Sequence, residues 1–160
     1  MARLVALTRR FATLIQGATA VLLLIAVVLN FLNVTGRYVF GAPIFWAEEV
    51  MLFLLVAIVF LGNSVVGWEG KQLRMDVVLH LLPHGWRRAL EILSDLAVIA
   101  VSLFIAWSSF PVIQMLAEFG QNSQVAEVPL VIPQVLIPIG LVLAAVFVAI
   151  RLLARPEARP

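Results

Sequence analysis

The residues best suited to chemistry form one short cluster, in which Arg37 is followed by Trp46, Glu48 and Glu49. A glycine and a proline between the arginine and the glutamates predict a tight turn that brings the opposite charges together. Neighbouring helical residues point about 100° apart, so Arg37 can pair with one glutamate while the other needs a different partner. Two interpretations stay open: an interfacial anchor with one intramolecular ion pair, or a contact surface for another membrane subunit or an extracytoplasmic partner.

Other parts of the sequence offer few groups for catalysis or ligand binding. His80 and His84 have the four-residue spacing of helical metal ligands, but Pro83 lies between them and no carboxylate is placed to complete a site. The chain has no cysteine, which excludes disulfides, thiolate metal sites and thiol redox chemistry. We therefore expect no catalytic residue, no cofactor and no metal, and a membrane enzyme is disfavoured because it lacks a nucleophile, base or metal cluster.

Four long uncharged stretches must position these residues. Hydrophobic residues make up 63% of the 160 and charged residues only 12%, which is too apolar for a soluble domain of this size. A bilayer core about 30 Å thick needs roughly 20 apolar residues per helix, and continuous apolar runs favour helices over a barrel. We predict an all-α integral membrane protein, one domain over residues 1–160, with transmembrane helices at about 11–36, 48–68, 90–117 and 129–151. The first is interpreted as a retained helix rather than a cleaved signal peptide, because its apolar run is too long.

The basic residues predict the orientation of these helices. The two tails and the second loop together hold ten of the eleven lysines and arginines, whereas the first loop holds only Arg37. The positive-inside rule then places both termini and the second loop in the cytoplasm. Because the basic residues alternate with apolar runs, the net charge of +2 does not indicate nucleic-acid binding.

The second loop is predicted to contain a short interfacial segment between the second and third helices. Asp76 can cap an apolar run, Val77 to Leu82, which Pro83 ends. The spans themselves have no ionisable residue near the bilayer midplane. A charge there normally marks a proton relay or an ion path, so an autonomous proton-coupled carrier is disfavoured.

An ordered set of short motifs resembles a known transporter family. The set runs from Asn33-Val34-x-x-Arg37-Tyr38-x-Phe40 through Trp46-x-Glu48-Glu49, Phe60-x-Gly62 and Leu73-Arg74-x-Asp76-Val77 to Pro129 and Pro138-Ile139-Gly140. Together these motifs resemble the small, DctQ-like membrane subunit of tripartite ATP-independent periplasmic (TRAP) transporters. One departure is Gln72, where the family often carries histidine, and this weakens any functional role for that position.

The resemblance implies a scaffold in the bacterial inner membrane. Such subunits work with a large multispanning permease subunit and a periplasmic solute-binding protein, and the system imports small organic acids on a sodium gradient. The implied partner or interface contacts are Arg37, Trp46, Glu48 and Glu49 on the periplasmic side, Lys71, Arg74 and Asp76 on the cytoplasmic side, and Asp95 slightly below the cytoplasmic surface. For Asp95 we expect a pair with Arg74, Arg88 or a basic residue of the large subunit.

Two other functions remain open alternatives. A small four-helix multidrug exporter has the same number of spans, but such exporters rely on a glutamate within the first span, where this chain has no acid. A non-transport assembly subunit of some unrelated complex is opposed only by the motif set. Membrane lipid is an expected partner under every one of these interpretations.

Overall fold

The computed structural model describes residues 2–69 and 84–154, apart from the side chains of residues 2–5, 69 and 84–88. In these residues the chain is all-α, as predicted. The four helices are α1 (Ala2–Val39), α2 (Ala47–Glu69), α4 (His84–Glu118) and α5 (Val131–Ala154). Each contains a stretch long and apolar enough to cross a membrane: 6–39, 47–68, 89–118 and 131–154. These stretches agree with the predicted spans to within a few residues at most ends, and α1 extends further at its beginning.

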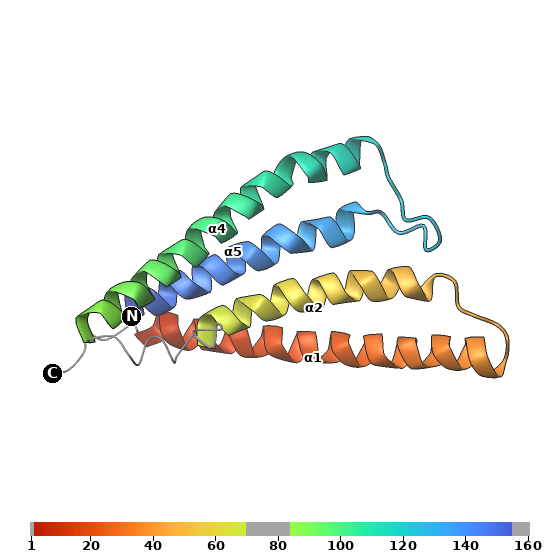
Figure 1. The fold of residues 1–160 in the computed structure, drawn as a ribbon, viewed down its shortest axis with the longest axis horizontal. Helices are drawn as coiled ribbons and strands as arrows, with labels where there is room; N and C mark the ends of the chain where they lie inside the picture. The colour runs from red at the N-terminus through yellow and green to blue at the C-terminus, as the bar shows by residue number, and fades with distance from the viewer. Residues whose placement is uncertain (1, 70–83, 155–160) are drawn as a thin grey trace.

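The helices form an open array instead of a closed bundle. Helix α1 packs on α2, α2 packs on α5, and α5 packs on α4, while α1 and α5 touch only slightly. Two antiparallel pairs, α1 with α2 and α4 with α5, therefore meet through the two inner helices, which run in the same direction (Figure 1). The end where α1 begins and α5 finishes is called here the termini end. The opposite end, with the connections 40–46 and 119–130, is the loop end. Towards the loop end α4 diverges from α1 (Figure 1).

The contact between α2 and α5 depends on a close approach of the two backbones at Gly140. A Cβ atom at this position would lie 2.5 Å from the carbonyl oxygen of Phe60. Ala144, one turn further along α5, is also small and buried and continues this face towards the termini end. There Phe147 packs edge-on against Phe11 and Trp68, which joins α1, α2 and α5 in one small apolar core. Small residues at a helix interface are the usual means of close packing in membranes.

Turn residues end the helices at the loop end. Gly41 has a positive φ of 63°, and the Ala42 N–H donates a hydrogen bond to the Gly36 carbonyl at 2.9 Å. A Cβ at Gly36 would lie 2.8 Å from the Ala42 oxygen, so glycine is needed for this tight return. The fourth span was expected from about residue 129, and α5 begins at Val131, directly after Pro129 pairs with Asn122 in an isolated antiparallel bridge.

The predicted segment 77–82 and the interface residues Lys71, Arg74 and Asp76 lie outside the described residues. The start of α1 and the end of α5 lie at the same end of the array, as four spans require (Figure 1). Their location in the cytoplasm stays a prediction from the basic residues.

Candidate functional site

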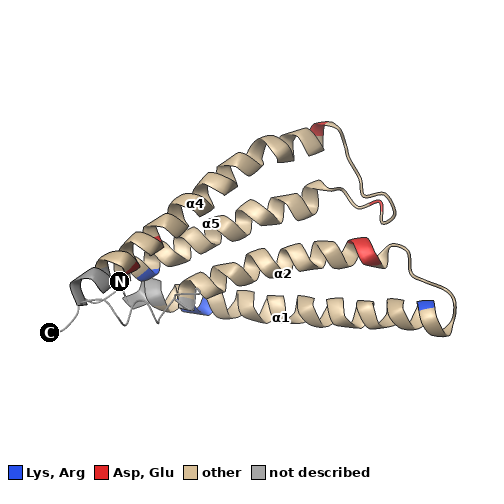
Figure 2. Cartoon of the chain, in the orientation of Figure 1, with Lys and Arg blue, Asp and Glu red and all other residues tan. Residues whose placement is uncertain are grey.

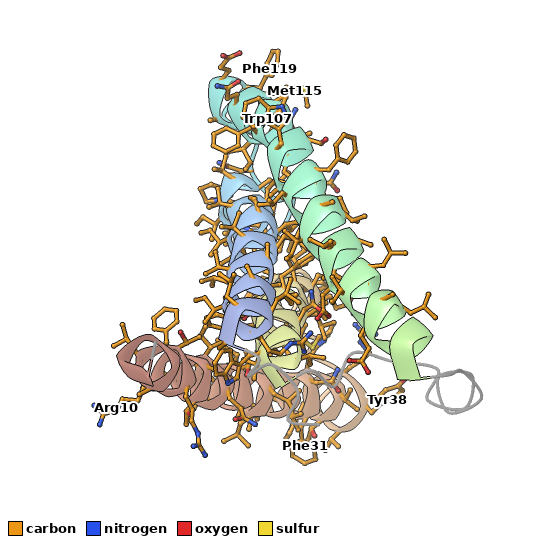
Figure 3. The ribbon with its side chains drawn as sticks, turned by 90° about the vertical axis from the view of Figure 1, so that its left-hand side faces the viewer. Arg10, Phe31, Tyr38, Trp107, Met115 and Phe119 are labelled. Atoms are coloured by element: carbon orange, nitrogen blue, oxygen red, sulfur yellow. The ribbon has the colours of Figure 1, made fainter. Side chains whose placement is uncertain are left out.

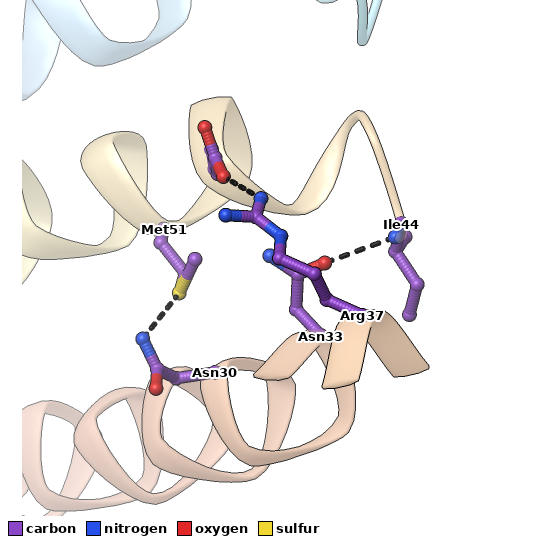
Figure 4. Close-up of polar contacts among 6 residues, drawn as sticks. Asn30, Asn33, Arg37, Ile44 and Met51 are labelled. Atoms are coloured by element: carbon purple, nitrogen blue, oxygen red, sulfur yellow. Dashed lines mark hydrogen bonds and ion pairs between the residues drawn. The ribbon is translucent and has the colours of Figure 1, made fainter. Parts of the chain in front are cut away.

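The first predicted contact forms at the loop end, where the Arg37 guanidinium pairs with the Glu48 carboxylate. The side chains remain 47% and 59% exposed, so water or headgroups can reach the pair. Two amides on α1 support this end of the hairpin (Figure 4). The buried Asn33 accepts a hydrogen bond from the Ile44 N–H at 2.9 Å, and Asn30 contacts the sulfur of Met51 at 3.3 Å. The connection 40–46 is thus fixed by α1 itself.

The second glutamate, Glu49, finds its partner inside the chain. One oxygen of its carboxylate accepts hydrogen bonds from the Ser123 hydroxyl, from the Val125 N–H at 3.1 Å and from the Ala126 N–H at 2.8 Å. These donors belong to the connection between α4 and α5, more than 70 residues away in sequence. Glu49 also lies in the first turn of α2, where negative charge is favoured. Glu49 therefore has a partner other than Arg37, and this partner is the 119–130 connection of the same chain.

The 119–130 connection is shaped to present those donors. The Ser123 N–H donates to the Val128 carbonyl at 2.9 Å, and the Leu130 N–H donates to the Gln121 carbonyl at 3.0 Å. Glu127 turns the chain with a positive φ of 53°. A pocket of 450 Å³ lies beside Glu49, between α2 and this connection, and includes the polar residues Gln121, Asn122 and Gln124 in its lining.

A buried charge contact lies at the termini end. An Arg151 nitrogen on α5 lies 2.6 Å from an Asp95 oxygen on α4. The Asp95 side chain is completely buried and that of Arg151 is 14% exposed. The expected partners in this chain, Arg74 and Arg88, fall outside the described side chains, so the structure does not test them. Arg151 was not among the expected partners. A buried carboxylate needs such a contact, because desolvating an unpaired charge costs several kcal/mol.

The remaining candidate, Trp46, is the last residue of the connection before α2, with 47% of its surface exposed. It extends the charged cluster as an aromatic residue at the edge of the apolar zone, where tryptophan is favoured. Sequence reasoning missed Asn33, Ser123 and Arg151 as site residues. Arg151 carried a signal, as the only charged residue between Val128 and Leu153. Asn33 lay within one of the motifs of the resemblance, whereas no sequence feature pointed to Ser123.

Comparison with known sequences identifies the family. Residues 25–156 match the family described as "Tripartite ATP-independent periplasmic transporters, DctQ component". This match covers most of the chain, including both charged ends. The chain belongs to the DctQ family.

Individual relatives agree with this assignment. The chain is 30% identical to "Ectoine TRAP transporter small permease protein TeaB" of Halomonas elongata over 84% of its own length and 72% of the relative's. It is 26% identical to "Isethionate TRAP transporter permease protein DctMQ" of Oleidesulfovibrio alaskensis over 66% of this chain but only 17% of that relative. It is 26% identical to "Putative TRAP transporter small permease protein" of Haemophilus influenzae over 58% of this chain and 56% of that relative.

As a DctQ protein the chain is a multi-pass membrane component of a TRAP transporter and not an enzyme. The family also implies a large TRAP permease as its partner. The ion pairs at the two ends of the helix array are therefore features of a transporter subunit.

Proposed function

We propose that this DctQ chain is a scaffold in the bacterial inner membrane. It holds the large permease subunit and helps to dock a periplasmic binding protein, so that small organic acids are taken up on a sodium gradient. The observation that carries this proposal is the distribution of charge. In the described helices all acidic and basic residues lie near the two ends, and the middle of every span is uncharged (Figure 2). Carriers that move a charged solute or ion need polar or ionisable groups at mid-depth.

The names of the relatives support the same division of labour. Two of them name different solutes, ectoine and isethionate, although both match this chain along much of its length. A subunit common to transporters of different solutes is better suited to hold a complex than to select a solute. The second relative is also much longer than the matched region, and its printed name, DctMQ, adds an M to the Q of DctQ. This suggests a large permease closely associated with a DctQ-like part.

The charge distribution also supports an orientation. Arg9, Arg10 and Arg151 lie at the termini end, whereas among the described residues only Arg37 carries a positive side chain at the loop end (Figure 2). By the positive-inside rule the termini end faces the cytoplasm and the loop end the periplasm. The exposed Phe45 and Trp46, with the pair of Arg37 and Glu48, then form the surface nearest to a periplasmic binding protein.

Reconstitution into liposomes tests this proposal. With the large permease subunit, the binding protein and an inward sodium gradient, we expect solute uptake only when the DctQ chain is present. The chain alone should move neither organic acids nor cationic dyes. Dye movement by the chain alone would instead favour the small multidrug exporter. Full uptake by the large subunit and binding protein without the chain would rule out a required scaffold.

A further inference from the structure

The edge helix α4 carries an unusual residue in the middle of its span. Trp107 is 79% exposed and lies on the outside of the helix array (Figure 3). It stands twelve residues from Asp95 and eleven from Glu118, which is about 17–18 Å of helix in either direction. Tryptophan in membrane proteins normally lies at the interfaces, where its indole N–H meets water or headgroups. Trp107 instead lies far from both ends of its apolar span, residues 89–118.

The indole N–H of Trp107 has no acceptor among the described residues of this chain. By contrast, the hydroxyl of Ser109, two residues further on, donates to the Ile105 carbonyl at 2.8 Å. A polar group left unpaired in hydrocarbon carries a desolvation penalty that an acceptor on a neighbouring helix would remove. An acyl chain offers no acceptor. The chemistry therefore favours a protein neighbour over lipid at this point.

Trp107 also lines a groove between α4 and α5 with a volume of 740 Å³. Ala106 and Phe110 contribute from α4, and Pro138 and Ile139 contribute from α5. Ala106 and Pro138 are buried between the two helices. Trp107, Phe110 and Ile139 are exposed and can pack against a neighbouring helix. The groove thus combines space, apolar walls and one hydrogen-bond donor.

We propose that this α4–α5 groove is the docking site for a transmembrane helix of the large permease subunit. The docked helix is apolar and carries a hydroxyl or a free carbonyl that accepts a hydrogen bond from the Trp107 indole. Among the described helices α4 packs mainly on α5, so its outer side is available for this contact. The inference rests on the proposed function for the existence of the partner, and adds the surface and the chemistry by which the partner is held.

Site-specific photo-cross-linking tests the location of the contact. A benzophenone amino acid replaces Trp107 in one variant and Ile105 in a control, and each variant is co-expressed with the tagged large permease subunit from the same organism. Ile105 is exposed, lies two residues away and therefore points about 200° from Trp107 around the helix. We expect at least tenfold more cross-linked large subunit from position 107. Equal yields, a stronger product from position 105, or only lipid adducts at position 107 would overturn the docking site.

Co-purification tests the hydrogen bond. Trp107→Phe keeps an aromatic ring but removes the donor, and should weaken recovery of the large subunit about threefold, since interhelical hydrogen bonds contribute about 0.6 kcal/mol. Trp107→Ala should weaken it further, and Ile105→Ala should leave it unchanged. Equal recovery for all three variants would contradict the inference. If the unmodified chain recovers no large subunit, the proposed function itself fails. If it does, and only the position-107 results disagree, the function stands and the groove is wrong.

Discussion

The two ends of this protein each hold an ion pair, and the pairs differ in almost every physical respect. At the termini end Asp95 is completely buried and meets Arg151 across the contact between α4 and α5. At the loop end Arg37 and Glu48 are about half exposed and join α1 to α2, which the chain already connects by a tight turn. The first pair links helices far apart in sequence, whereas the second reinforces a local hairpin. Burial and sequence distance, more than charge, should decide what each pair contributes.

The largest effect is expected from breaking the buried pair. Asp95→Asn removes the negative charge while Arg151 stays, and this should reduce the stability of the protein by about 3–5 kcal/mol. Thermal unfolding of the purified chain in detergent measures the loss. We also expect weaker assembly of the transporter without any change in the solute transported.

The apolar replacement Asp95→Leu with Arg151→Met is the control for this prediction. Replacing a buried pair by hydrophobic residues is often neutral, so the double variant should regain at least half of the lost stability. A double variant as unstable as Asp95→Asn would mean that the charges have a further role. A change in solute preference in any of these variants would contradict the scaffold interpretation.

The close packing of α2 against α5, between the two ends, can be tested at Gly140. Gly140→Ala inserts a Cβ atom 2.5 Å from the Phe60 oxygen and should force α2 and α5 apart, with a cost of about 1–3 kcal/mol. Gly62→Ala is the matched control, since nothing lies within 4 Å of its added Cβ, and it should be neutral or stabilising by up to about 1 kcal/mol. Thermal unfolding of both variants measures the difference. Equal behaviour would show that the two helices are not held at this close approach.

A third carboxylate, Glu49, is intermediate in burial between Asp95 and Glu48 and should give an intermediate effect. Glu49→Gln replaces charged hydrogen bonds from the Ser123 hydroxyl and the Val125 and Ala126 amides by weaker neutral ones, which should loosen this connection. Hydrogen exchange at the Val125 and Ala126 amides measures it directly, and both should exchange faster. Glu48→Gln, one residue away, should leave these amides unchanged. Slower exchange in the Glu49 variant would contradict its role as the acceptor for this connection.

The contrast between the ends also explains what the sequence could predict. The spans followed from uncharged runs, and the pairing of Arg37 with a glutamate followed from the short turn between them. The partners of Asp95 and Glu49 did not, because Arg151 lies 56 residues from Asp95 and the donors to Glu49 lie 74–77 residues away. Such contacts depend on how the helices are arranged, and no local pattern encodes that. Local rules would also allow Pro129 in a first helical turn, whereas in the structure it pairs with Asn122 just before α5 begins.

The smallest effect is expected at the exposed pair, and it can distinguish the two interpretations of the loop end. A double-mutant cycle with Arg37→Gln and Glu48→Gln should give a coupling of about 0.2–1 kcal/mol in the isolated chain, reduced further by salt. If a partner covers this surface, water leaves the pair, and the coupling measured in the assembled transporter should rise above that range and lose its salt dependence. If the pair is only an interfacial anchor, both values should be equal. An exposed ion pair of little value to the isolated chain thus becomes a sensitive probe of whether a second protein binds there.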